Sequence, residues 1–130
     1  GIIYQGGWYN DQKHGFGVLS DKNGLQIYSG DWQNDSFSGK GFLSNLNVSS
    51  EDVIEFDYTN MNGAWNHWIS YEGEFGDGKM EGKGILNLSN GDTFNGKFKD
   101  GMVNGEGCFY KKTGEVILGV WEDNVLIHHL

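Results

Sequence analysis

The sequence predicts an all-β protein, an elongated single-sheet antiparallel meander in which one β-hairpin follows another. The basis is a short pattern in which Gly comes two positions after an aromatic or aliphatic residue, and Trp or Phe comes four positions after it. A Gly-x-Gly pair follows seven residues after each of the first four copies. The copies are Tyr4-x-Gly6-x-Trp8, Tyr28-x-Gly30-x-Trp32, Tyr71-x-Gly73-x-Phe75, Phe94-x-Gly96-x-Phe98 and Ile117-x-Gly119-x-Trp121. Most begin 23 or 24 residues apart, and a fixed period of this size is typical of repeat arrays.

The composition favours an ordered chain. Glycine fills 22 of the 130 positions, but it recurs at strict spacing beside 5 Trp, 6 Tyr and 8 Phe. Disordered chains are poor in aromatic residues, because they bury little apolar area. A length of 130 residues suits one domain, so we expect residues 1–130 to form a single repeat domain.

The first half of each repeat is predicted to be a strand with one apolar face. Side chains alternate between the two faces of a strand, so both rings of Tyr71–Phe75 and Gly73 share a face. Glu72 and Glu74 then point to the other face, where they look like solvated charges rather than a catalytic acid and base. Each first strand therefore offers rings on one side and polar groups on the other.

Side chains in the second half of each repeat are predicted to alternate between the two faces in the same way. In the third repeat, Gly82, Gly84 and Leu86 are predicted to share the face that bears the rings. Glycine inside a strand is costly, so its regular placement predicts aromatic rings lying across bare backbone. Pairs such as Asp77-Gly78 and Asp100-Gly101 favour tight turns, so each repeat is expected to be one β-hairpin.

The face opposite the rings is predicted to be mixed. Second strands place apolar Val18, Phe42, Ile85 and Cys108 there, beside polar residues of the first strands. We therefore expect a twisted, coiled sheet without a second layer on that face. Cys108 stands where other repeats have Phe or Ile, which favours a buried structural thiol over a nucleophile.

These residues resemble the MORN-repeat family, whose unit runs Tyr-x-Gly-x-Trp, then Gly-x-Gly, then a Gly-Asp-x-Tyr junction, matched here by Gly91-Asp92-Thr93-Phe94. In this interpretation about 4.5 repeats begin near residues 4, 28, 71 and 94, with a C-terminal half-repeat near 117 that acts as a cap. The resemblance implies an extended meander of hairpins. It also implies roles in scaffolding, dimerisation, partner binding, or targeting to membranes or the cytoskeleton.

An insertion at residues 44–70 interrupts the period, because the second and third copies begin 43 residues apart. Apolar residues alternate with acids over 52–58, as in a strand. Met61-x-Gly63-x-Trp65 echoes a first strand, which leaves open whether the insertion is a degraded, shortened repeat. Trp65 and Trp68 are either core residues packed over a neighbouring hairpin or part of a binding site. We expect the features that distinguish this chain from other repeat proteins to lie in this insertion.

Charge and motif content argue against several functions. The net charge of −9 and the absence of Arg disfavour nucleic acid as a partner, and also anionic lipid. A lone cysteine and the lack of a long apolar run predict an intracellular protein, cytoplasmic or associated with the cytoskeleton. The four His residues have no metal-ligand spacing, and no cofactor motif is present, so we expect no metal, no cofactor and no catalysis. The His residues are His14, His67, His128 and His129.

The leading hypothesis is a non-catalytic scaffold or interaction module that binds a helical or extended segment of another protein along the aromatic and glycine face, or associates with itself. The predicted partner-binding residues are Tyr28, Trp32, Tyr71, Phe75, Phe94, Phe98, Trp65 and Trp68. The hypothesis requires rings that are exposed on one side; if the chain itself covers every ring, pairing through an edge remains. The alternatives are a module that targets membrane phospholipid and a regulatory segment of a larger enzyme.

Overall fold

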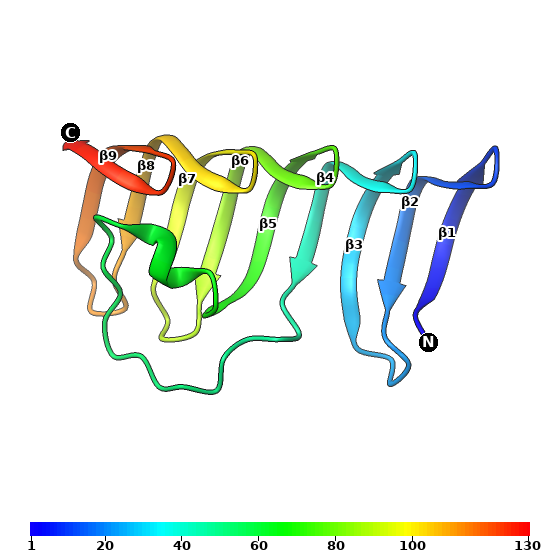
Figure 1. Cartoon of the computed structure of the whole chain (residues 1–130), viewed down its shortest axis with the longest axis horizontal. Coiled ribbons are helices and arrows are strands. Elements are labelled where there is room, and N and C mark those ends of the chain that lie inside the picture. The colour runs from blue at the N-terminus through cyan, green and yellow to red at the C-terminus, as the bar shows by residue number, and fades with distance from the viewer.

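A computed structural model describes all 130 residues. One antiparallel sheet holds ten strands in chain order, which confirms the predicted all-β meander (Figure 1). The strands are β1 (Ile3–Tyr9), β2 (Gln12–Ser20), β3 (Gln26–Gln33), β4 (Ser36–Ser44), β5 (Trp68–Gly76), β6 (Lys79–Leu88), β7 (Thr93–Lys99), β8 (Met102–Tyr110), β9 (Val116–Glu122) and β10 (Val125–His129). The one helical element is a 3₁₀ turn, η1 (Met61–Ala64).

Two-residue turns close all five hairpins. Both residues of each turn have positive φ, which Asn, Asp and Gly adopt at low cost and which matches the twist of the flanking strands. The turn pairs are Asn10-Asp11, Asn34-Asp35, Asp77-Gly78, Asp100-Gly101 and Asp123-Asn124. The fifth unit, expected to be a half-repeat, thus forms a complete hairpin, although β10 has no Gly-x-Gly pair.

A row of glycines crosses the sheet, one from each strand except β10. The row is Gly6, Gly17, Gly30, Gly41, Gly73, Gly84, Gly96, Gly107 and Gly119, each paired with the next across the strands. Rings of the first strands lie over the glycines of the second strands, as Tyr71 lies over Gly84 and Phe94 over Gly107. A Cβ at either glycine would come within 3.0 Å of that ring. We call this side of the sheet the ring face and the opposite side the back face.

A β-bulge changes which residues of the second strands point to the ring face. The register shifts between Gly73 and Phe75, so that Gly84 and Leu86 lie on the ring face but Gly82 does not. Gly82 has φ of 80°, and a Cβ there would meet the Glu74 side chain instead. The expectation that all three residues share a face is wrong at Gly82, because strict alternation does not survive the bulge.

The connection between β4 and β5, residues 45–67, crosses the ring face, and we call it the strap. It leaves β4, runs beside the strands from β6 onward and returns to β5 (Figure 1). Residues 52–58 are irregular rather than a strand, and Met61–Ala64 is η1 rather than a repeat strand, so both strand-like patterns in the insertion were misleading. Local side-chain bonds bend the backbone here: Asp57 accepts from the Thr59 N–H, and Asn60 accepts from the Asn62 N–H.

Candidate functional site

The six predicted rings of the repeats form the core of the ring face. Tyr28, Tyr71 and Phe94 are 0% exposed, and the other three are at most 6% exposed. Each first-strand ring meets the Trp or Phe of the next repeat edge-to-face, with centroids 5.0 to 5.3 Å apart. The other three rings are Trp32, Phe75 and Phe98. Contact between these rings and a partner stays a prediction, and it requires their covering neighbours to give way.

Two buried tyrosines also anchor the hairpins through their hydroxyl groups. Tyr28 Oη donates to the Asp31 carbonyl at 2.8 Å, and Tyr71 Oη donates to the Glu74 carbonyl at 2.7 Å. Burial raises the pKa of Tyr28 to about 12, and the neighbouring Asp31 carboxylate adds to the rise. Burial and Glu74 raise the pKa of Tyr71 further still.

These raised pKa values predict alkaline unfolding. A group whose pKa is higher in the folded chain contributes stability that is complete below its unfolded pKa, near 10, and is lost as the pH rises through the folded pKa. For Tyr28 that window runs from pH 10 to about 12. We expect the free energy of unfolding, measured by urea denaturation, to fall less steeply over this window in the Tyr28→Phe/Tyr71→Phe variant, since Phe94 already fills the equivalent position. Equal slopes for both proteins would contradict the assignment.

The strap inserts apolar side chains into the ring face of β6 to β10. Phe56, Met61 and Ala64 are buried and belong to the same core cluster as Phe109 and Trp121. Sequence reasoning missed Phe56 and Met61 as site residues. The alternation around Phe56 marked it as an apolar position, but nothing in the sequence showed which repeats it contacts.

Hydrogen bonds made by the strap backbone fix the strap on the last hairpin. Trp121 Nε1 donates to the Tyr58 carbonyl at 2.7 Å, the Leu126 N–H donates to the Thr59 carbonyl at 2.8 Å, and the Met61 N–H donates to the Asn124 carbonyl at 2.7 Å. The last two bonds flank an antiparallel bridge between Asn60 and Val125. The strap therefore pairs with the beginning of β10, at Val125, in addition to crossing the ring face.

The two tryptophans predicted within the insertion lie at the return of the strap. Trp65 and Trp68 are half-buried and pack against the core cluster. Trp65 follows η1 and Trp68 begins β5. The structure thus places Trp65 near the end of the strap and Trp68 directly after it, both packed against the cluster that contains the six repeat rings. Partner contact through them stays a prediction.

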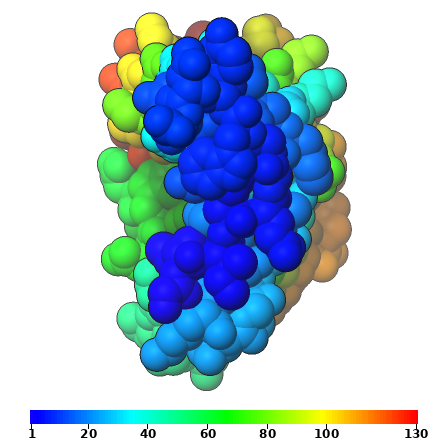
Figure 2. All heavy atoms as spheres, turned by 90° about the vertical axis from the view of Figure 1, so that its right-hand side faces the viewer, coloured from blue at the N-terminus to red at the C-terminus, as the bar shows by residue number.

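The β1 end of the sheet is the uncovered end. Trp8 is 59% exposed, whereas the equivalent residues of the four later repeats are at most 6% exposed, because no ring of an earlier repeat packs against it. Figure 2 views this end, and the N-terminal hairpin forms its surface. Lys13 pairs with Trp8 in this hairpin, at the position where the later hairpins have an apolar residue. Its ammonium group lies 5.5 to 5.8 Å from the ring centroids of Tyr4, Trp8 and Trp32.

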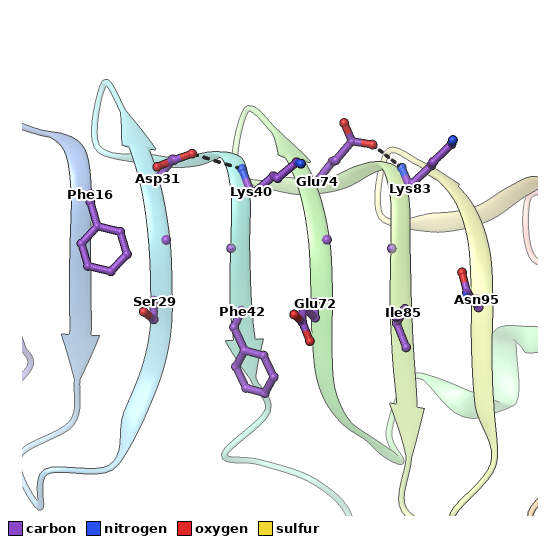
Figure 3. Close-up of a pocket in the computed structure, with 14 residues that line it drawn as sticks. Phe16, Ser29, Asp31, Lys40, Phe42, Glu72, Glu74, Lys83, Ile85 and Asn95 are labelled. Carbon is purple, nitrogen blue, oxygen red and sulfur yellow. Dashed lines mark hydrogen bonds between the residues drawn. The ribbon is translucent and has the colours of Figure 1, made fainter.

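The back face carries a shallow trough of about 960 Å³ whose floor is the bare backbone of the glycine row. Figure 3 shows it from the side opposite the strap, with Asp31, Lys40, Glu74 and Lys83 along one rim. Asp31 accepts from the Lys40 N–H at 3.3 Å and Glu74 from the Lys83 N–H at 2.8 Å. Both carboxylates thus stabilise the bulged second strands, which gives them a structural role.

Other chemical features of the chain are few. Cys108 is free and buried, as its position in the repeat predicts. His, Cys, Asp and Glu side chains form no group of three or more that could hold a metal ion. None of the helical segments has the length and apolar character that crossing a membrane requires.

Comparison with known protein families gives one result. The MORN repeat model matches residues 4–26, 28–44, 71–93 and 94–116. No curated protein matches the chain. MORN repeats are generally protein or membrane interaction modules and are typically non-catalytic. The four matches cover most of the chain and coincide with the first four hairpins, and the chain therefore belongs to the MORN repeat family.

Proposed function

We propose that this chain is a non-catalytic interaction module whose ring face binds an extended segment of another protein. The observation that carries the proposal is the strap, an irregular segment that the ring face holds by burying Phe56, Met61 and Ala64. The same face supplies a hydrogen-bond donor for the strap backbone, the indole N–H of Trp121. A ring face that holds one such segment has the chemistry to hold another.

The half of the ring face over β1 to β4 is the proposed seat of the partner. The strap does not cross this half (Figure 1). Tyr4, Leu19, Ile27 and Leu43 lie here and are only half-buried, and the exposed Trp8 adjoins them. The proposed partner segment resembles the strap: extended, with apolar side chains spaced along it and free backbone carbonyls.

Supplying the strap as a separate peptide tests whether the ring face is a binding surface. In the test variant, residues 45–67 are replaced by Asp-Lys-Asn-Gly-Leu, the sequence that joins β2 to β3 in this chain. A fluorescent peptide of residues 48–67 should bind this variant, as measured by fluorescence anisotropy. Binding should weaken at least about tenfold when the peptide carries Phe56→Ala, since a buried Phe contributes more than the roughly 1.4 kcal/mol that tenfold represents.

The matched control is a peptide with Ile54→Ala. Ile54 is 85% exposed on the strap, so this peptide should bind like the unmodified one. The intact chain keeps the half over β1 to β4 open, so it should bind the unmodified peptide as well. No binding by a folded strapless variant, or equal loss with both substituted peptides, would refute the proposal.

A further inference from the structure

The back face holds a second surface that the proposed function does not use. Its trough crosses the strands from β2 to β7 and is bounded by two rows of side chains, one on each side of the glycine row (Figure 3). In β4 these side chains are Lys40 and Phe42, and in β6 they are Lys83 and Ile85. Each of these two strands therefore presents a cation on one wall of the trough and an apolar side chain on the other.

The lysines beside the trough have no acidic partner within the chain. The ion pairs of this structure involve other lysines, and Lys40, Lys83 and Lys97 form none. Lys83 lies directly opposite Lys97 in the ladder between β6 and β7, where like charges repel each other. The nearby Glu74 carboxylate accepts from the Lys83 backbone N–H at 2.8 Å rather than from an ammonium group. Three unpaired cations on one surface of a chain whose net charge is −9 favour carboxylates supplied by a ligand.

The two walls repeat at the spacing of two helical turns. β4 and β6 lie two strand spacings apart, which is about 9.6 Å at the usual 4.8 Å between strands. Seven residues of α-helix span about 10.5 Å. A helix that crosses the strands at right angles can therefore place one apolar residue against Phe42 and another, seven positions on, against Ile85. The residue after each apolar one lies about 100° round the helix and, for one of the two helix directions, points to the wall of Lys40 and Lys83.

The trough suits a helix better than an extended chain. The backbone groups on its floor are paired in the ladders of the sheet, so they are not free to bind the backbone of a ligand. A helix satisfies its own N–H and C=O groups, whereas an extended segment would depend on water for them. On a strand, the side chains whose spacing is nearest to that of the walls lie three positions apart, and these point to opposite faces.

We propose that the trough is a docking site for an amphipathic helix of another protein, one that carries an apolar residue followed by an acidic residue at every seventh position. The apolar residues pack against Phe42 and Ile85, and the acidic residues pair with Lys40 and Lys83. From β2 to β7 the site spans five strand spacings, about 24 Å, which is the length of about 16 helical residues. A helix docked on the back face leaves the ring face free, so this site does not depend on the proposed function.

A designed peptide tests the site on the intact chain. It consists of Leu-Glu-Ala-Ala-Gln-Lys-Ala twice, followed by Leu-Glu, so that Leu-Glu pairs recur every seven residues and Glu and Lys four positions apart support the helix. Fluorescence anisotropy should show saturable binding of the labelled peptide. The Lys83→Glu variant should bind it at least about fivefold more weakly, roughly 1 kcal/mol, because an attractive ion pair becomes a repulsive one. A peptide with Glu and Lys exchanged should show the reverse preference.

Two controls separate docking from general effects of charge. Lys22→Glu changes the net charge by the same amount, but Lys22 is exposed in the turn between β2 and β3, outside the trough. This variant should bind the peptide like the unmodified chain. A peptide whose tenth residue is Pro instead of Ala should lose binding, because proline breaks the helix on the side that faces away from the trough.

Methyl NMR signals locate the peptide without any variant. In the unmodified chain the peptide should shift the signals of Ile85, which is exposed on the back face, more than those of its buried neighbour Leu86 on the ring face. The strap peptide of residues 48–67 should not compete, so failure of this site and failure of the proposed function are distinguishable. No binding by the unmodified chain, equal weakening by Lys83→Glu and Lys22→Glu, full binding of the proline peptide, or competition by the strap peptide would overturn the proposal.

Discussion

Replacing Gly84 with alanine should lower the free energy of unfolding by about 3 kcal/mol or more, the upper range for overpacking a core. Gly84 is buried in the glycine row, and a Cβ there would come within 3.0 Å of the Tyr71 ring. Tyr71 is 0% exposed and touches Phe75 and Phe98, so the ring has no free space to enter. Urea denaturation followed by tryptophan fluorescence measures the loss.

Two comparisons identify the clash as the cause. Gly63→Ala adds a methyl group where nothing lies within 4 Å and should change the free energy of unfolding by less than about 0.5 kcal/mol. Gly84→Ala should cost less in a Tyr71→Ala background than in the unmodified chain, because the two residues are in contact. Additive losses in the double variant would show that the ring is not what Gly84 accommodates.

Replacing Phe56 with alanine should destabilise the chain by about 3 to 5 kcal/mol, the usual range for a buried Phe. Phe56 is 6% exposed and lies in the core cluster, although it comes from the strap rather than from a repeat. The loss should appear first as local release of the strap. Hydrogen exchange should therefore quicken at the Leu126 amide, which donates to the Thr59 carbonyl, before it quickens in the central strands.

Ile54→Ala is the matched control on the same segment. Ile54 is 85% exposed only two positions from Phe56, so its replacement should leave both the stability and the Leu126 amide unchanged. If Phe56→Ala were as mild as Ile54→Ala, the strap would not be part of the core.

The sequence predicted the repeat fold well because its determinants are local. Turn pairs such as Asp77-Gly78 impose positive φ within two residues, and the spacing from Gly73 to Gly84 places rings over glycines inside one hairpin. The path of the strap could not be predicted in the same way. The strap is held by residues more than fifty positions further along the chain, such as Phe109 and Trp121, which contact Tyr58, and the alternation of apolar residues with acids in the strap resembles a strand.

The burial of the repeat rings could not be predicted from the sequence, for a related reason. Alternation shows that Tyr28 and Phe75 share a face, but it does not show that they meet edge-to-face with centroids 5.3 Å apart. That contact between successive repeats buries Tyr28 on the half of the ring face that the strap does not cross. Trp8 is exposed in agreement with this account, because in this structure no ring of another repeat lies where Tyr28 lies beside Phe75.

The strap pairs with the beginning of β10, where its backbone takes up hydrogen-bonding groups that another strand would need. A sheet that is open at both ends can add copies without limit, and such head-to-tail growth produces fibres. Here the bridge between Asn60 and Val125 occupies the beginning of the outer edge of β10, so a strand that paired there would have to displace the strap. The insertion that interrupts the repeats thus also obstructs the addition of a strand at β10.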